Sequence, residues 1–257
     1  MFIIETNNLN KVYKSGTKAL NDVNINIKKG SITGLIGVNG AGKSTLINIL
    51  VSLINKTSGN IKIFNLNLDS KNLLSIKKDI GFVSSEIAAY EHLSIIEYWT
   101  FIGNMYKIKK DDIKTRIDDL LDVLDLSDAS HKLIREFSKG MKQKALIGGA
   151  LIHKPKLLIL DEPLNGIDPV SSVIIKNILK QFNKNGVTIL ISAHDLSLID
   201  DVCSDVIVID NGKIKYENDI NEMHNKYKDL SLEEIFLKVT NRTDKINKTL
   251  SWGEGND

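Results

Sequence analysis

The hydrophobic and polar positions of this chain predict alternating strands and helices. Residues 23–27 alternate apolar side chains with asparagines, and this period of two is typical of a half-buried strand. Residues 32–36 predict a second strand, after which apolar residues recur at helical spacing over residues 46–53. A glycine-rich loop therefore joins a strand to a helix. Further apolar runs predict strands over residues 61–64, 80–83, 157–160, 188–191 and 206–209.

The order of these elements favours an α/β fold with parallel strands. Helical patterns separate most of the later strands, whereas residues 94–153 show helical spacing without any strand pattern, so we expect an all-helical insertion there. Residues 210–212, Asp-Asn-Gly, form a turn sequence that can close a β-hairpin. From residue 219 onward, short helical patterns predict a small C-terminal appendage.

Composition and charge narrow the classes of function. The chain has 257 residues with 34 basic and 32 acidic side chains, and a formal net charge of +2 does not indicate a nucleic-acid partner. Its one cysteine, Cys203, excludes an intrachain disulfide and fits a reducing compartment. The first residues lack the pattern of a signal peptide, and no apolar run approaches the roughly 20 residues of a membrane-spanning helix. We therefore expect a cytoplasmic protein that reaches a membrane only through a partner.

Residues 37–45, GVNGAGKST, match the phosphate-binding loop (P-loop) pattern G-x-x-x-x-G-K-[ST] between a predicted strand and a predicted helix. Backbone N–H groups can converge on phosphate oxygens where few Cβ atoms intrude, and the positive end of the following helix favours the anion. Lys43 would reach the β- and γ-phosphates of a nucleotide, and the Ser44 hydroxyl would bind Mg²⁺. A glycine-rich turn before an ordinary helix is the simpler alternative. The predicted nucleotide-binding residues of this loop are Gly37, Asn39, Gly40, Ala41, Gly42, Lys43, Ser44 and Thr45.

Residues 156–163, KLLILDEP, supply two carboxylates. Four apolar residues of a buried strand deliver Asp161 and Glu162 to its carboxyl end, where α/β sheets bind ligands. Asp161 would hold the Mg²⁺ shell, and Glu162 would orient or deprotonate the attacking water. The alternative is a strand that simply ends in acidic turn residues. This alternative becomes less favoured when the two carboxylates are considered together with the loop at residues 37–45.

With these two motifs the chain resembles an ATP-binding-cassette (ABC) transporter nucleotide-binding subunit over about residues 2–240. The signature motif of that family, usually LSGGQ, corresponds to FSKGM at residues 137–141, which keeps Ser138 and Gly140. The resemblance implies that these two residues contact the γ-phosphate of ATP held by a second subunit. A role for Ser138 as a helix N-cap alone is the other interpretation.

The other family motifs follow in order along the chain. Tyr13 matches the aromatic residue that stacks on adenine, residues 165–169 resemble the D-loop of the dimer interface, and His194 matches the switch histidine that contacts the γ-phosphate. The resemblance therefore implies that His194 acts with Lys43 and Glu162 in catalysis.

One family motif differs in this chain. The family places a glutamine after the strand at residues 80–83, where it reaches the metal and the attacking water, whereas this chain has Ser85 with Glu86 beside it. Serine is shorter and could act only through a water, while Glu86 offers a charged substitute. We therefore expect the metal contact to come from Ser85 or Glu86, in addition to Ser44 and Asp161.

The resemblance also implies a fold and a domain organisation. We expect the P-loop NTPase fold of an ABC cassette, with a mostly parallel core sheet, an N-terminal antiparallel β part and an inserted helical subdomain. The expected organisation is a single ATPase domain over residues 1–240 that contains the helical subdomain at about 94–153, and a small helical tail over residues 219–257.

The implied activity is ATP hydrolysis, with ATP and Mg²⁺ as cofactors. One P-loop and one signature motif per chain imply that two cassettes, expected as a homodimer, close on ATP and open after hydrolysis. A separate transmembrane permease subunit is the implied partner and would hold the chain at the inner face of the cell membrane, with export as the expected direction. Two alternatives stay open: a soluble ABC-type ATPase that acts on ribosomes or DNA, and a nucleotide-gated clamp that hydrolyses ATP poorly.

Overall fold

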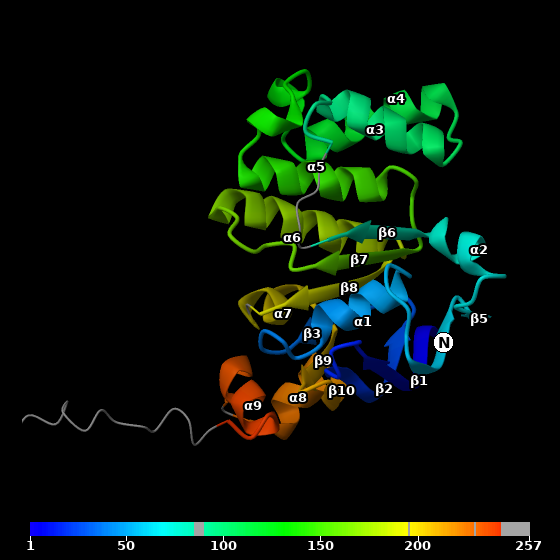
Figure 1. The fold of residues 1–257 in the computed structure, drawn as a ribbon. Coiled ribbons are helices and arrows are strands. Elements are labelled where there is room, and N and C mark those ends of the chain that lie inside the picture. Colours follow the sequence, from blue (N-terminus) through cyan, green and yellow to red (C-terminus); the bar gives the residue numbers. More distant parts are fainter. Residues whose placement is uncertain (85–89, 195, 229, 243–257) are drawn as a thin grey trace, which may run out of the picture.

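The centre of the molecule is a six-stranded sheet (Figure 1), seen in a computed structural model that describes residues 1–84, 90–194, 196–228 and 230–242. Five of its strands run parallel to their neighbours, and the sixth, β10, pairs antiparallel with β9. In spatial order the strands are β10 (Lys213–Asp219), β9 (Asp205–Asp210), β3 (Ile32–Ile36), β8 (Thr188–Ala193), β7 (Leu157–Asp161) and β6 (Ile80–Val83). This order confirms the predicted α/β fold with a mostly parallel core sheet.

The central strands are buried on both faces because other elements cover each side of the sheet. Leu158 and Leu160 of β7 contribute to one hydrophobic cluster with the helices of the middle of the chain. The alternate residues Leu157 and Ile159 contribute to a second cluster with α1 (Lys43–Leu50) and the N-terminal strands. Continuous apolar runs in the sequence therefore correspond to strands between two layers.

A second sheet, formed mainly by the N-terminal strands, is antiparallel, as expected. Its order is β2 (Lys18–Lys28), β1 (Phe2–Val12), β4 (Ser58–Ile63) and β5 (Leu66–Asn67). The alternation over residues 23–27 lies in β2, where the three apolar side chains are buried. Strand β1 was not predicted, because register shifts and a left-handed Asn8 (φ 46°) interrupt its alternation of buried and exposed positions.

Residues 94–153 form helices that stack above the edge of the core sheet at β6 (Figure 1). The fully buried Trp99 joins them, because its indole N–H donates to the Ala145 carbonyl oxygen at 2.8 Å and its ring lies on Gly148. A capping box between Ser94 and Glu97 fixes the start of the first helix. The elements are α3 (Ile95–Met105), α4 (Lys110–Val123), two 3₁₀ turns (Ser127–Ala129 and Ile134–Glu136) and α5 (Lys139–Leu151).

The remaining helices pack around the core sheet. Near the C-terminal end, Met223 and Ile235 are fully buried in the same cluster as the helices of residues 94–153. Within the described residues, no helix is both long enough and apolar enough to cross a membrane. These helices are α2 (Leu73–Lys77), α6 (Pro169–Lys184), α7 (Leu196–Val202), α8 (Ile220–Lys226) and α9 (Leu232–Val239).

Candidate functional site

The glycine-rich loop lies between β3 and α1, as its sequence context predicts. Gly42 stands at the N-cap of α1 with φ 112°, a left-handed conformation that a side chain would disfavour. Asn39 and Gly40 are exposed at the tip of the loop, and the Ser44 side chain is exposed in the first turn of the helix. The loop therefore presents backbone N–H groups and a hydroxyl at the positive end of a helix, where an anion is favoured.

Lys43 is held in the middle of this loop. Its side chain is only 5% exposed, and its ammonium nitrogen donates to the Gly37 carbonyl oxygen at 2.8 Å. The same nitrogen lies 3.6 Å from Oε1 of Glu162. The structure thus places the lysine of the loop beside the second carboxylate of the KLLILDEP motif, as the sequence motifs imply.

Asp161 and Glu162 both contact one side chain that the sequence analysis did not single out. Ser192 lies opposite Asp161 in the pairing of β7 with β8, and its hydroxyl donates to Oδ1 of Asp161. The same hydroxyl oxygen accepts from the Glu162 backbone N–H at 3.0 Å. Glu162 adopts a left-handed backbone conformation with φ 51°, so it leaves the strand direction while Asp161 stays buried. The only sequence signal for Ser192 is its place two residues before His194 in ISAHDL.

Replacing Ser192 by alanine should lower the turnover number for ATP hydrolysis more than it raises the Michaelis constant. The change removes the hydroxyl that bonds Asp161 and the Glu162 N–H, and leaves that N–H only its 3.2 Å bond to the Ser192 carbonyl oxygen, so the left-handed turn at Glu162 is held less firmly. Steady-state ATP hydrolysis by wild type and Ser192→Ala measures both constants. A matched Ser70→Ala variant, at an exposed position, should behave as wild type. Equal turnover numbers in all three proteins would contradict this role of Ser192.

The Glu162 carboxylate is the centre of a charged cluster. Its Oε1 faces Lys43, and its Oε2 lies 3.3 Å from Nδ1 of His194 and accepts from the Asn165 amide nitrogen at 3.2 Å. The Glu162 side chain is 16% exposed and that of His194 is 50% exposed, so solvent reaches the cluster from the histidine side. A cavity of about 130 Å³ opens here, lined by Glu162, Asn165 and His194 among others. The three predicted catalytic residues therefore lie together.

Tyr13 lies at the edge of the same site. Its hydroxyl is 3.2 Å from the Thr45 hydroxyl in the first turn of α1, and the side chain is partly exposed. The Lys11 ammonium lies over the tyrosine ring, 5.1 Å from its centroid. An aromatic ring is therefore available beside the loop, where an adenine can stack on it.

Ser138 and Gly140 occupy the start of α5. The Ser138 hydroxyl caps the helix by accepting from the Met141 N–H at 3.2 Å. Gly140 packs against Asp168 and Ser171 at the start of α6, where a Cβ would have no room. These contacts are with α5 and α6, not with the P-loop. The observed contacts of Ser138 and Gly140 therefore do not connect these residues to the phosphate site of the same chain.

The predicted metal ligands are described only in part. Ser85 and Glu86 lie outside the described residues. Of the others, Ser44 offers an exposed hydroxyl and Asp161 a buried carboxylate, which are oxygen ligands of the kind that Mg²⁺ prefers. Within the described part of the chain, no group of three or more His, Cys, Asp or Glu residues could hold a metal ion alone. The donor set fits a Mg²⁺ ion that also takes oxygens from a bound phosphate.

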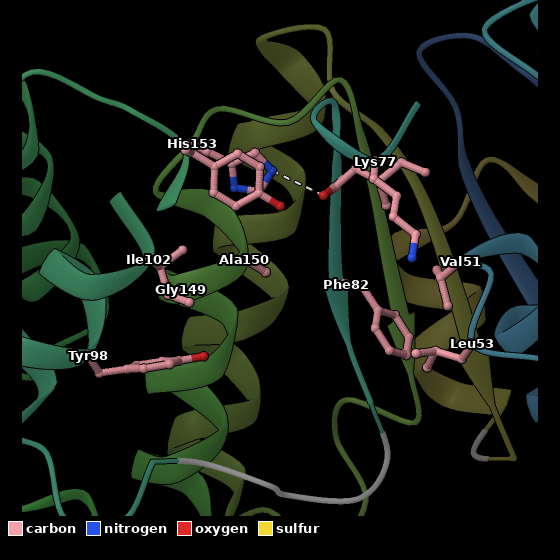
Figure 2. A pocket seen from close by; sticks show the side chains of 11 residues that line it. Val51, Leu53, Lys77, Phe82, Tyr98, Ile102, Gly149, Ala150 and His153 are labelled. Carbon is pink, nitrogen blue, oxygen red and sulfur yellow. Dashed lines mark hydrogen bonds between the residues drawn. The ribbon is translucent and has the colours of Figure 1, made fainter. Parts of the chain in front are cut away.

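A second cavity, of about 270 Å³, lies between β6 and the helices α3 and α5 (Figure 2). His153 borders it, with its ring stacked on Tyr106 at a centroid distance of 3.8 Å. Its Nε2 donates to the Ile80 carbonyl oxygen at 3.1 Å, which assigns the proton to Nε2, and the buried Nδ1 has no hydrogen-bond partner among the described residues. Other lining residues are Val51, Leu53, Lys77, Phe82, Tyr98 and Ile102.

The environment of His153 predicts a pH-dependent stability. Burial lowers the pKa of the imidazole below its ordinary 6.5, although the Ile80 carbonyl and Asp79 act in the opposite direction. Because burial lowers the folded pKa, the unfolded chain binds more protons than the folded chain between the two pKa values. The stability that neutral His153 contributes is therefore present above about pH 6.5, and it is lost as the pH falls from there through the folded pKa. His153→Gln retains a donor for Ile80 but does not titrate. Its unfolding midpoint should therefore fall less steeply between pH 7 and 5 than that of wild type.

Comparison with known proteins identifies the family. The family model described as "ABC transporter" matches residues 20–165. The chain is 32% identical over 225 residues to the ABC transporter ATP-binding protein NatA of Bacillus subtilis, covering 87% of this chain and 91% of NatA. It is 38% identical over 236 residues to the bacitracin transport ATP-binding protein BcrA of Bacillus licheniformis, covering 90% of this chain and 76% of BcrA. A methionine import ATP-binding protein of Acinetobacter baylyi is 34% identical over 224 residues, with coverages of 82% and 61%.

Solved structures agree with this assignment. The solved structure of an ATP-binding subunit of an ABC transporter superimposes with a TM-score of 0.85 at 27% identity, covering 93% of this chain and 99% of the other. A dimeric ATP-binding cassette in a post-hydrolysis state, bound to ADP and Pi, gives a TM-score of 0.77 at 27% identity, covering 84% and 98%. With the P-loop, the Glu162 cluster and the fold in agreement, the chain belongs to the ABC transporter family as an ATP-binding, ATP-hydrolysing subunit.

Proposed function

We propose that this subunit powers export through a separate transmembrane permease, working as a homodimer with Mg²⁺ and ATP at the inner face of the membrane. The observation that carries the proposal is the cluster of Lys43, Glu162 and His194 beside the helix N-terminus that follows the P-loop. This cluster offers a cation for phosphate, a carboxylate for water and a further hydrogen-bonding group. Its parts are those that ATP hydrolysis needs.

The residues of one chain divide the work as follows. The backbone amides of residues 39–45 and the Lys43 ammonium bind the phosphates, and Tyr13 stacks on the adenine. Ser44 and Asp161 would hold Mg²⁺, which neutralises phosphate charge when bound. Glu162 takes a proton from the attacking water, because its carboxylate is held by Lys43 and Asn165 in an orientation toward the cavity. His194 contacts the γ-phosphate and donates a ring N–H to one of its oxygens.

A second copy of the chain would complete each site. Ser138 and Gly140 lie at the N-terminus of α5, a second helix end suited to an anion, but their observed contacts are with α5 and α6. Pairing two chains head to tail would bring this helix end onto the phosphate held by the partner. The dimeric cassette bound to ADP and Pi among the similar structures supports the pairing of two chains.

The permease would contact the cavity between β6 and the helices α3 and α5 (Figure 2). Large apolar side chains gather at and around it without being buried: Leu53 is 61% exposed and Met105 64% exposed, and the rings of Tyr90 and Phe101 meet edge to face nearby. Exposed apolar patches of this kind are typical of protein contact sites. The relatives are named for bacitracin transport and for methionine import at similar identity, so their names support transport, and the efflux measurement below decides the direction.

The test is ATP turnover by the purified chain with Mg²⁺, combined with affinity isolation of the chain from detergent-solubilised membranes of its own source. The proposal expects hydrolysis, an ATP-dependent dimer, and one co-isolated integral membrane protein without a cassette of its own. Efflux of that transporter's cargo from loaded cells would establish the direction. Isolation with ribosomes, and not with membranes, would overturn the proposal in favour of a soluble ATPase.

The serine in place of the family's glutamine motivates one further candidate, a nucleotide-gated clamp. Ser85→Gln restores the longer side chain and distinguishes the two functions. Under the clamp alternative, wild type closes on ATP with almost no turnover, and Ser85→Gln raises turnover. Under the proposed function, wild type already turns over and the substitution changes the rate little. Ser84→Gln, one residue earlier, is the positional control.

A further inference from the structure

An ion pair on the C-terminal segment lies directly behind the P-loop. Asp210 is the last residue of β9, and its side chain is only 5% exposed. One carboxylate oxygen accepts from Nη2 of Arg242 at 2.5 Å, and the other accepts from the Asn211 amide nitrogen at 3.0 Å. Arg242 is the last residue of the described chain and lies 32 positions away from Asp210 in the sequence. A buried carboxylate therefore has its cationic partner on a remote segment.

The end of helix α9 places this arginine. Asn241 adopts the left-handed conformation, φ 54°, and its backbone N–H donates to the Lys238 carbonyl oxygen. The Arg242 backbone N–H donates to the Leu237 carbonyl oxygen. This pair of hydrogen bonds is a Schellman motif, which reverses the chain sharply at a helix end. A capping box at the other end of the helix fixes its start, so the position of Arg242 is set by a well-defined helix.

The turn that follows Asp210 contacts the P-loop itself. The Gly212 N–H donates to the Ala41 carbonyl oxygen at 2.9 Å, and the Gly212 carbonyl accepts from the Asn21 N–H at 2.8 Å. The backbone of Ile209 approaches Gly37 so closely that no Cβ would fit between them. The loop thus lies on the end of β9 and on its turn without intervening side chains. A shift of this turn would be passed directly to the phosphate-binding amides.

We propose that Arg242 is a positioning residue for the P-loop, acting through Asp210 and the turn at residues 210–212. A buried carboxylate is costly without a cationic partner, so the turn keeps its place only while Arg242 neutralises Asp210. The C-terminal helix thereby sets the affinity of the loop for nucleotide. Lys43, Glu162 and His194 are not part of this contact, so the turnover number depends on it much less than the affinity does.

The test uses the full chain and two nucleotides. Calorimetric titration with Mg·ADP, which is not hydrolysed, gives the Kd for the P-loop, and steady-state hydrolysis of Mg·ATP gives KM and kcat. Arg242→Gln should raise the Kd for ADP and the KM for ATP about fivefold or more, with kcat changed less than twofold. Arg242→Lys should recover most of the affinity. Lys228→Gln, which removes a positive charge from an exposed position of the same segment, should match wild type.

A double-mutant cycle distinguishes a positioning role of Arg242 from a contribution to the folding stability alone. Asp210→Asn alone should also raise the Kd for ADP, because it breaks the ion pair that holds the turn, and in that background Arg242→Gln should cause little further loss of ADP affinity. A lowered thermal midpoint for Arg242→Gln with an unchanged Kd for ADP would overturn the proposal. If Arg242→Gln does not fold, Asp210→Asn decides alone: a raised Kd supports the proposal and an unchanged Kd rejects it. Wild-type ADP binding, measured in the same series, tests the nucleotide site independently.

Discussion

Lys43→Ala is expected to abolish measurable ATP turnover, with a loss of about a hundredfold to a thousandfold or more, and to weaken ATP binding. The Lys43 ammonium is almost completely buried and points into the loop, held by the Gly37 carbonyl and by Glu162. It is the cation of the P-loop, and alanine offers no charge in its place. Phosphate release measured at saturating Mg·ATP gives the turnover, and titration with Mg·ADP gives the affinity.

Lys29→Ala is the matched control for this experiment, because Lys29 is exposed in the turn between β2 and β3. It should retain wild-type turnover and affinity. Retention of more than a tenth of the wild-type turnover in Lys43→Ala would contradict the assignment of this lysine to the transferred phosphate. A folded far-ultraviolet circular dichroism spectrum for both variants excludes trivial unfolding.

Glu162→Gln should lose about 10²–10⁴-fold in turnover while binding ATP as tightly as wild type, and it should accumulate as an ATP-bound dimer. The amide keeps the size of the side chain and its contact with Asn165, but it cannot accept a proton from water. Size-exclusion chromatography with light scattering, in the presence of Mg·ATP, measures the dimer. Turnover is measured in the same samples.

Glu233→Gln provides the control for the loss of one carboxylate, because Glu233 is exposed in the first turn of α9. This variant should hydrolyse ATP as wild type does and should show no stable dimer. If Glu162→Gln turned over ATP at the wild-type rate, Glu162 would not be the group that accepts a proton from the attacking water. If the dimer formed equally well with ADP, dimerisation would not depend on the γ-phosphate.

The sequence predicts those parts of the fold in which local pattern and tertiary environment agree. The strand at residues 157–160 is a continuous apolar run because β7 is covered on both faces, so its pattern is unambiguous. Strand β1 could not be predicted, since its pairing with two neighbours includes bulges that destroy the period of two. The short helix α2 was not predicted for a related reason: among its residues only Ile76 is buried, so it has no repeating apolar face.

The candidate site shows the same division. Lys43, Asp161 and Glu162 were predicted because their motifs are contiguous and their chemistry depends on residue type. Ser192 could not be predicted, because its importance arises from its register opposite Asp161 in two strands that are far apart in the sequence. The contact between Arg242 and Asp210 is of the same kind. No local pattern indicates a contact between a helix end and a strand end that only the fold brings together.

The distance between Lys43 and Glu162 has a consequence for the timing of the reaction. Lys43 has Glu162 as its counterion, at 3.6 Å. Under the proposed roles of these two residues, a phosphate group that arrives at Lys43 would replace the carboxylate as counterion, and its negative charge would repel that carboxylate toward His194 and the open side of the cavity. The pair would then work as an interlock: the base would be freed for water only when the phosphate that the water must attack is already bound.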